Sequence, residues 1–148
     1  MSIAETNQRT VLIADDHHLV GEAFSQFLSA VGTYVPTLAR DVLEAKAEIL
    51  ASGPFDLILL DLYMPGMEGP ETISEIVRLN KGGRVVVLTG GNNRFRQSAI
   101  FAAGASGLVL KSQPAKQIVA ALESVLDGEI YFPLSDDRHL DRVMAQAV

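Results

Sequence analysis

Short apolar runs alternate with longer amphipathic stretches along the chain, and this alternation occurs five times. The short runs are continuously apolar, which is typical of parallel strands that are covered on both faces. Pro36 has no N–H to donate to a neighbouring strand, so its run should lie at an edge of the sheet if it forms a strand at all. We expect strands at 10–14, 33–39, 55–60, 84–91 and 107–111.

The longer stretches carry apolar residues at intervals of three and four, which is typical of helices that pack on one side. Three of their ends carry helix signals: Asp41 as an N-cap, Gly53 as a C-cap and Pro70 near a first helical position. We expect helices within 18–32, 41–53, 69–83, 95–105 and 114–128. Such an alternation predicts an α/β domain with a parallel sheet and right-handed crossovers.

The composition limits the chain to one compact domain and narrows its chemistry. Its 148 residues are 48% hydrophobic, which is enough for one core but not for a second full domain. The absence of cysteine excludes disulfides, cysteine metal sites and thiol nucleophiles. A net charge of −6, with scattered basic residues, argues against nucleic-acid binding by this chain itself.

The distribution of apolar and charged residues also predicts the domain boundaries and the localisation of the protein. We divide it into an N-terminal extension at 1–9, a domain at 10–128 and a segment at 129–148 that is a tail or the start of a linker. The first residues lack the basic and apolar regions of a secretory signal, and no apolar run reaches the roughly 18 to 20 residues that span a bilayer. We therefore expect a soluble, cytoplasmic protein with no membrane partner.

Polar residues lie at the carboxyl ends of four of the five predicted strands. The first strand ends in Asp15 and Asp16, the third in Asp61, the fourth in Thr89 and the fifth in Lys111. Ligands of doubly wound sheets bind beyond the carboxyl ends of the strands, so these side chains should meet at one edge. Crowded carboxylates repel one another unless a cation lies among them, and Mg²⁺ prefers such oxygen ligands. The pattern predicts a Mg²⁺ site that accepts a phosphoryl group.

Asp61 is the best candidate for the nucleophile of this site. It ends the most apolar strand, and the following Met64, Pro65 and Gly66 stop that strand and turn the chain. The carboxylate would project from a rigid platform, and a carboxylate can attack phosphorus to form an acyl phosphate.

These motifs resemble the receiver domain of two-component response regulators, over roughly 10–128. The matching motifs are ADD at 14–16, DLYMPGMEG at 61–69, LTG at 88–90, and LVLKS at 108–112 with a proline soon after. The resemblance implies a flavodoxin-like (βα)5 fold, a doubly wound five-stranded parallel sheet in the order 2-1-3-4-5. Further motifs, VLIADDHHLV at 11–20 and GEIYFP at 128–133, are similar to the NarL/FixJ (LuxR-type) class.

The resemblance also implies roles for these residues. Asp61 would be the phosphoacceptor that a histidine kinase loads. Thr89 and Lys111 would bind the phosphoryl oxygens. Mg²⁺ would be held by Asp16, by Asp15 through water, by Asp61 and by the main-chain oxygen of Tyr63. Loading would switch the conformation of the domain and control an output.

The class suggests what that output is. It implies transcription regulation by a DNA-binding effector domain that is absent from this chain, and a possible homodimer through the fourth helix, fifth strand and fifth helix. Leu108 stands where receivers of this class usually carry Tyr or Phe, three residues before the lysine.

The same sequence also allows other interpretations of the protein's function. The chain could be a stand-alone receiver or a phosphate-independent pseudo-receiver. A phosphatase of the haloacid-dehalogenase type fits less well, because Tyr63 occupies the place of its second aspartate and no length remains for a cap domain. We expect no enzyme activity beyond slow self-dephosphorylation. We interpret His17 and His18 as lying outside any metal site, since adjacent residues at a helix start point in different directions.

Overall fold

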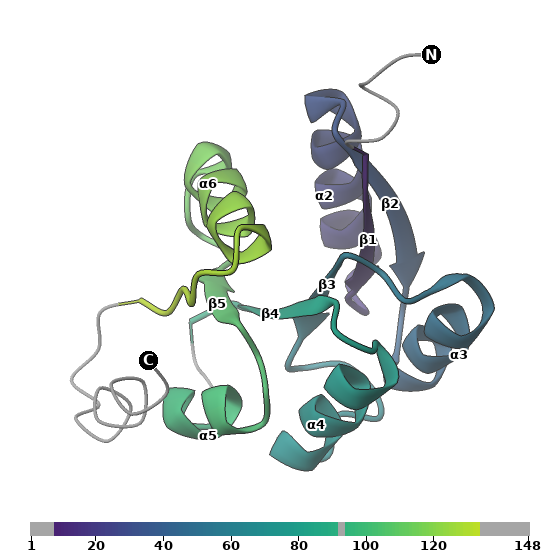
Figure 1. The fold of residues 1–148 in the computed structure, drawn as a ribbon, viewed down its shortest axis with the longest axis vertical. Coiled ribbons are helices and arrows are strands. Elements are labelled where there is room, and N and C mark those ends of the chain that lie inside the picture. The colour runs from purple at the N-terminus through teal and green to yellow at the C-terminus, as the bar shows by residue number, and fades with distance from the viewer. Residues whose placement is uncertain (1–7, 92–93, 134–148) are drawn as a thin grey trace.

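The computed structural model describes residues 8–91 and 94–133, which form one parallel sheet with helices on both faces (Figure 1). The predicted extension at 1–9 and segment at 129–148 fall largely outside the described residues. In chain order the elements are β1 (Arg9–Ala14), α2 (His18–Val31), β2 (Tyr34–Ala39), α3 (Val42–Ser52), β3 (Leu57–Asp61), α4 (Pro70–Leu79), β4 (Arg84–Thr89), α5 (Gln97–Ala102), β5 (Gly107–Leu110) and α6 (Ala115–Leu126).

The strand order is β2-β1-β3-β4-β5, and all neighbouring strands run parallel. This is the predicted order 2-1-3-4-5. The strand that contains Pro36 does form, and it lies at the outer edge as its missing N–H requires. The predicted fold is therefore confirmed.

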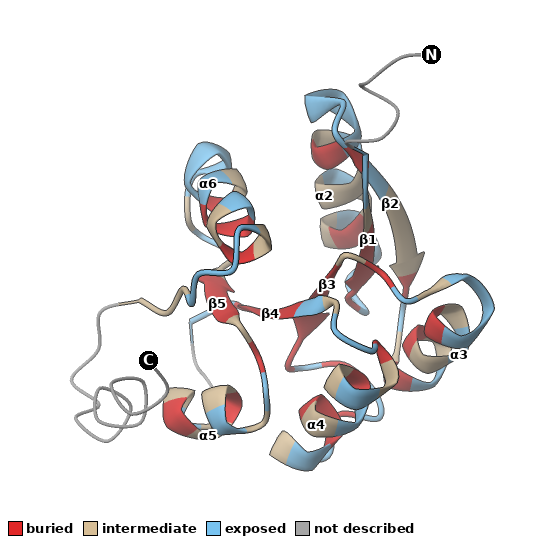
Figure 2. Ribbon diagram, in the orientation of Figure 1, coloured by how far each residue is buried: buried red, intermediate tan, exposed pale blue. Residues whose placement is uncertain are grey.

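The sheet separates two apolar cores, because alternate side chains of each strand point to opposite faces. Ile58 and Leu60 face the core beneath α3, α4 and α5, while Leu57 and Leu59 face the core beneath α2 and α6. Every residue of β3 is buried, which is visible in the colouring of the central strands in Figure 2. The apolar run that ends in Asp61 thus forms a platform fixed from both sides.

The helix ends mostly follow the predicted caps. Asp41 accepts a hydrogen bond at Oδ1 from the N–H of Glu44 (2.7 Å), and Pro70 is the first residue of α4. The prediction at 95–105 was too long, because α5 covers only Gln97–Ala102. The backbone of Arg96 is extended, with φ −65° and ψ 147°, so the helix begins after it.

The amino ends of the strands are joined by side-chain hydrogen bonds. The fully buried Asn80 receives the N–H of Phe55 at Oδ1 (2.8 Å) and donates from Nδ2 to the Phe55 carbonyl (2.9 Å). Asp56 accepts the N–H of Thr10 (2.9 Å) at Oδ2, and its own N–H donates to the Thr10 hydroxyl (3.0 Å). These pairs fix the start of β3 against β1 and the end of α4.

The segment at 129–133, which we call the β5 strap, lies along the free edge of β5. The N–H of Leu108 donates to the carbonyl of Tyr131 (2.8 Å), and the N–H of Tyr131 donates to the carbonyl of Ser106 (3.0 Å). A Cβ on Gly107 would lie 2.8 Å from the Tyr131 carbonyl oxygen, so this close approach requires glycine. The ring of Phe132 packs edge-on against Phe101 on α5, with centroids 5.8 Å apart. The sheet therefore continues one step beyond β5.

Among the residues that the structure describes, no helix is long and apolar enough to cross a bilayer.

Candidate functional site

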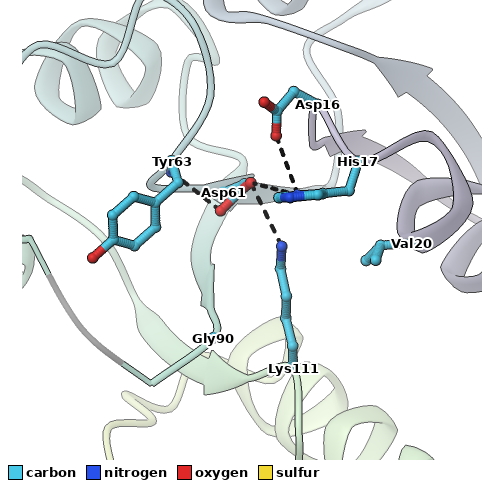
Figure 3. A pocket seen from close by; sticks show the side chains of 7 residues that line it. All are labelled: Asp16, His17, Val20, Asp61, Tyr63, Gly90 and Lys111. Carbon is cyan, nitrogen blue, oxygen red and sulfur yellow. Dashed lines mark hydrogen bonds and ion pairs between the residues drawn. The ribbon is translucent and has the colours of Figure 1, made fainter.

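The predicted site residues gather at the carboxyl ends of the strands, because each lies at or just after the last residue of its strand. A cavity of about 660 Å³ opens there. Figure 3 shows two side chains directed toward Asp61: His17 from the start of α2 and Lys111 from the end of β5. The cavity is lined by Asp16, His17, Val20, Asp61, Tyr63, Gly90 and Lys111.

Asp61 is the last residue of β3, and only 1% of its surface is exposed. Its Oδ1 accepts the N–H of Tyr63 (3.2 Å), which fixes the orientation of the carboxylate. Its Oδ2 faces the Lys111 ammonium at 3.5 Å. One oxygen is thus held by the backbone, and the other faces a cation at the cavity.

Asp15 contacts the same lysine and is also buried, with 3% exposed. Its Oδ1 accepts the N–H of His17 (2.9 Å), and its Oδ2 forms an ion pair with the Lys111 ammonium (3.0 Å). Asp16 is more exposed and lines the cavity. A single lysine is therefore shared between two buried carboxylates.

The two buried carboxyl groups respond differently to this environment. Burial raises the pKa of Asp61, and the nearby negative charge of Asp15 raises it further against the opposing hydrogen bond from Tyr63. Burial also acts to raise the pKa of Asp15, but the His17 N–H and the Lys111 ammonium outweigh it and lower that pKa. Asp61 is consequently the carboxylate whose charge is least compensated.

This arrangement fits a hard divalent cation. The Oδ2 atoms of Asp15 and Asp61 are buried and receive no directed hydrogen bond from any residue that the structure describes. Ligand atoms of Asp15, Asp16, Asp61 and His17 all lie within 4.8 Å of one another. Carboxylate oxygens grouped in this way are the ligands that Mg²⁺ takes, with water completing its shell. Tyr63 lines the same cavity, and its main-chain oxygen remains a predicted ligand.

Thr89 and Lys111 are joined through the backbone at the ends of β4 and β5. The N–H of Lys111 donates to the carbonyl of Thr89 (2.7 Å). The Thr89 side chain is fully buried beside the cavity residue Gly90, and its hydroxyl accepts the N–H of Gly91 (3.4 Å). All of the predicted site residues thus lie at this edge of the sheet.

His17 lies among the carboxylates of this cluster, while its exclusion from the metal site stays a prediction. Its Nδ1 is 3.1 Å from Asp15 Oδ1 and 3.2 Å from Asp16 Oδ1. His18, by contrast, points along α2 to Glu22, at 3.6 Å. The two adjacent histidines do diverge, as expected, but one of them turns back toward the carboxylates. The place of His17 directly after the acidic pair was the available signal.

Arg94 is a second residue that the sequence did not single out. Its Nη1 donates to the carbonyls of Leu62 (3.1 Å) and Met67 (2.9 Å), both in the loop that follows Asp61. Its guanidinium carbon lies 5.9 Å from the ring centre of Tyr63 and 5.2 Å from that of Phe95. Arg94 therefore connects the loop after β4 to the loop after β3.

Comparison with known proteins agrees with this geometry. The family model described as "Response regulator receiver domain" matches residues 11–123. The chain belongs to this family. Receivers of the NarL/LuxR class are among its relatives, which confirms the predicted class as well as the family.

The curated relatives of this receiver are longer proteins. It is 31% identical over 121 residues to the nitrate/nitrite response regulator protein NarL of Escherichia coli K12, covering 82% of this chain and 56% of NarL. It is 32% identical over 123 residues to the oxygen regulatory protein NreC of Staphylococcus epidermidis, covering 82% of this chain and 56% of NreC. The receiver thus spans about half the length of these relatives.

Solved structures place the receiver in the same class. A LuxR-family two-component response regulator from Aurantimonas sp. SI85-9A1 has a TM-score of 0.75 and 25% identity, covering 95% of this chain and 99% of that one. The receiver domain of the putative response regulator NarL from Mycobacterium tuberculosis has a TM-score of 0.73 and 28% identity, covering 83% and 99%. The flavodoxin-like fold predicted for this receiver is confirmed.

Proposed function

We propose that this receiver is a phosphorylation-driven switch, loaded on Asp61 by a histidine kinase in the presence of Mg²⁺. The observation that carries the proposal is the position of Asp61. Its Oδ2 is buried at the cavity, faces Lys111 at 3.5 Å and has no directed hydrogen bond from a described residue. Such an oxygen is oriented, poorly compensated and available to form a bond.

In the proposed reaction the Asp61 oxygen attacks the phosphorus of the kinase phosphohistidine. The P–N bond breaks, its electron pair returns to the imidazole nitrogen, and Asp61 becomes an acyl phosphate. Lys111 would contact the phosphoryl oxygens, and the Thr89 hydroxyl would bind another after turning from Gly91. Mg²⁺, held by Asp15, Asp16, Asp61 and the Tyr63 carbonyl oxygen, would neutralise charge that develops on the transferred group.

The output of the switch is proposed from its relatives. NarL and NreC are named as regulators, and this chain matches about half of each. We propose that phosphorylation controls transcription in the cytoplasm through a DNA-binding domain, with homodimerisation through α5, β5 and α6. The chain would have no enzyme activity beyond slow hydrolysis of its own acyl phosphate.

Incubation with acetyl phosphate and Mg²⁺ tests the proposal. Intact-mass spectrometry should detect one added phosphoryl group on the wild type and none on Asp61→Asn. Equal labelling of both proteins would contradict the role of Asp61. No labelling of the wild type, with beryllofluoride also failing to bind, would favour a phosphate-independent pseudo-receiver. Multiple turnover of a phosphomonoester would favour a phosphatase.

A further inference from the structure

We propose that Arg94 is a positioning residue that holds the loop after Asp61 in its metal-binding conformation. The inference rests on the proposed Mg²⁺-dependent function of Asp61 and assigns part of it to a residue outside the acidic cluster. The loop in question, 62–69, carries Tyr63, whose main-chain oxygen is a proposed metal ligand.

Hydrogen bonds from several elements anchor this loop, including one from the N–H of Glu68 to the Thr72 hydroxyl on α4 (3.2 Å). At its start, the N–H of Tyr63 donates to Asp61 Oδ1 (3.2 Å). On the α3 side, the N–H of Val42 donates to the carbonyl of Pro65 (3.0 Å). On the opposite side, Arg94 of the loop after β4 donates from Nη1 to two loop carbonyls. Without Arg94, the loop would keep its hydrogen bonds to Asp61, α3 and α4 but lose these two.

The chemistry of the contact suits an arginine. A single guanidinium nitrogen carries two hydrogens in a fixed plane, and here they reach the carbonyls of Leu62 and Met67 at 3.1 and 2.9 Å. The flat group also lies over the Tyr63 ring. Because the two acceptors flank Tyr63 along the chain, the bonds restrict the peptide that would present its oxygen to the metal. Groups that do not touch the metal but hydrogen-bond to its ligands, or to the backbone beside them, orient those ligands.

The direction in which Mg²⁺ affinity changes when Arg94 is substituted separates a positioning role from a purely electrostatic one. Arg94 carries a positive charge close to a cation site, so its charge alone opposes Mg²⁺ binding. Removing only the charge should strengthen Mg²⁺ binding or leave it unchanged. Removing an anchor of the loop should weaken Mg²⁺ binding, because part of the binding free energy would then order the loop.

Three variants of the full chain test the inference. Arg94→Met keeps the aliphatic stem but removes the donors, and Arg94→Lys keeps a charge and donors. The matched control is Arg96→Met, since Arg96 is exposed in the same loop and its side chain contacts no described residue through a hydrogen bond or ion pair. Mg²⁺ affinity is measured by calorimetry, and hydrogen exchange of peptides covering 62–69 is measured without metal.

We expect Arg94→Met to weaken Mg²⁺ binding about tenfold and to speed exchange in 62–69, whereas Arg94→Lys recovers most of the affinity. Arg96→Met should bind Mg²⁺ as well as the wild type or slightly better. Unchanged exchange or unchanged affinity in Arg94→Met would overturn the inference. If the wild type is not phosphorylated by acetyl phosphate, the proposed function fails, and the exchange measurement still decides whether Arg94 anchors the loop.

Discussion

Asn80, at the amino ends of the strands, and Asp61, at their carboxyl ends, are both almost completely buried, with 0% and 1% exposed. Asn80 uses its amide oxygen and nitrogen in two hydrogen bonds to the backbone of Phe55. Asp61 has one oxygen without a directed hydrogen bond, a second buried carboxylate nearby and a shared lysine. Buried polar groups are normally paired, and a group left unpaired in a native protein calls for an explanation.

The difference assigns separate tasks to the two ends of the sheet. The amino end stabilises the fold, since its polar groups replace the hydrogen bonds that they lose with water. The carboxyl end holds Asp61, whose negative charge the fold disfavours because it is buried beside Asp15 without full compensation. The apolar platform of β3 connects the two ends and holds Asp61 in place despite this cost.

The largest expected effect is at the amino end. Asn80→Ala leaves the N–H and the carbonyl of Phe55 buried without partners, which should lower the free energy of unfolding by about 3 kcal/mol. Urea denaturation measures the loss. Lys116→Ala, at an exposed position on α6, is the control and should change stability by less than about 0.5 kcal/mol. If Asn80→Ala lowered the free energy of unfolding as little as Lys116→Ala does, the amino end would not stabilise the fold in the way described.

At the carboxyl end, removing a charge should act in the opposite direction. Asp61→Asn keeps an oxygen that can accept the Tyr63 N–H but removes the repulsion with Asp15, so we expect about 2 kcal/mol of added stability at neutral pH. The same denaturation experiment, on matched samples without divalent metal, gives the comparison. A destabilised variant would mean that the Lys111 pair contributes more than the repulsion costs.

Bound Mg²⁺ should compensate the buried charge of Asp61 and so reduce the difference in stability contribution between the two ends of the sheet. A cation that binds only the folded wild type at ten times its dissociation constant adds about 1.4 kcal/mol of stability. Thermal denaturation with and without MgCl₂ should therefore show stabilisation of the wild type. Asp61→Asn should respond much less, and an equal response in both proteins would place the bound ion elsewhere.

The smallest effect concerns pH. The pKa of Asp61 is raised above its ordinary 3.8, so the folded protein binds a proton there more readily than the unfolded chain. The stability that proton binding at Asp61 contributes is complete below pH 3.8 and is lost as pH rises through the pKa of the folded state. The advantage of Asp61→Asn over the wild type should therefore shrink as pH falls toward 3.8. Denaturation curves across this range measure it, and a constant advantage would exclude Asp61 as the titrating group.

Much of this fold and site followed from short-range rules. Asp41 precedes an amphipathic stretch and caps it, and the polar residues at the carboxyl ends of the strands meet because parallel strands end at one edge. Features that depend on long-range contacts did not follow. Arg94 reaches carbonyls at positions 62 and 67, and Tyr131 pairs with β5 through single backbone bonds that leave no periodic pattern. The direction of His17 is likewise set by Asp15 and Asp16.

The β5 strap has a consequence for how the chain behaves at high concentration. The outermost strand of an open sheet presents backbone donors and acceptors that can recruit a strand from another molecule. Here Tyr131 occupies the Leu108 donor of β5 and the Ser106 acceptor just before it, and at the other edge β2 lacks a donor at Pro36. Neither edge offers an uninterrupted template to a neighbouring copy. A chain with 48% hydrophobic residues thereby gains protection against polymerising edge to edge.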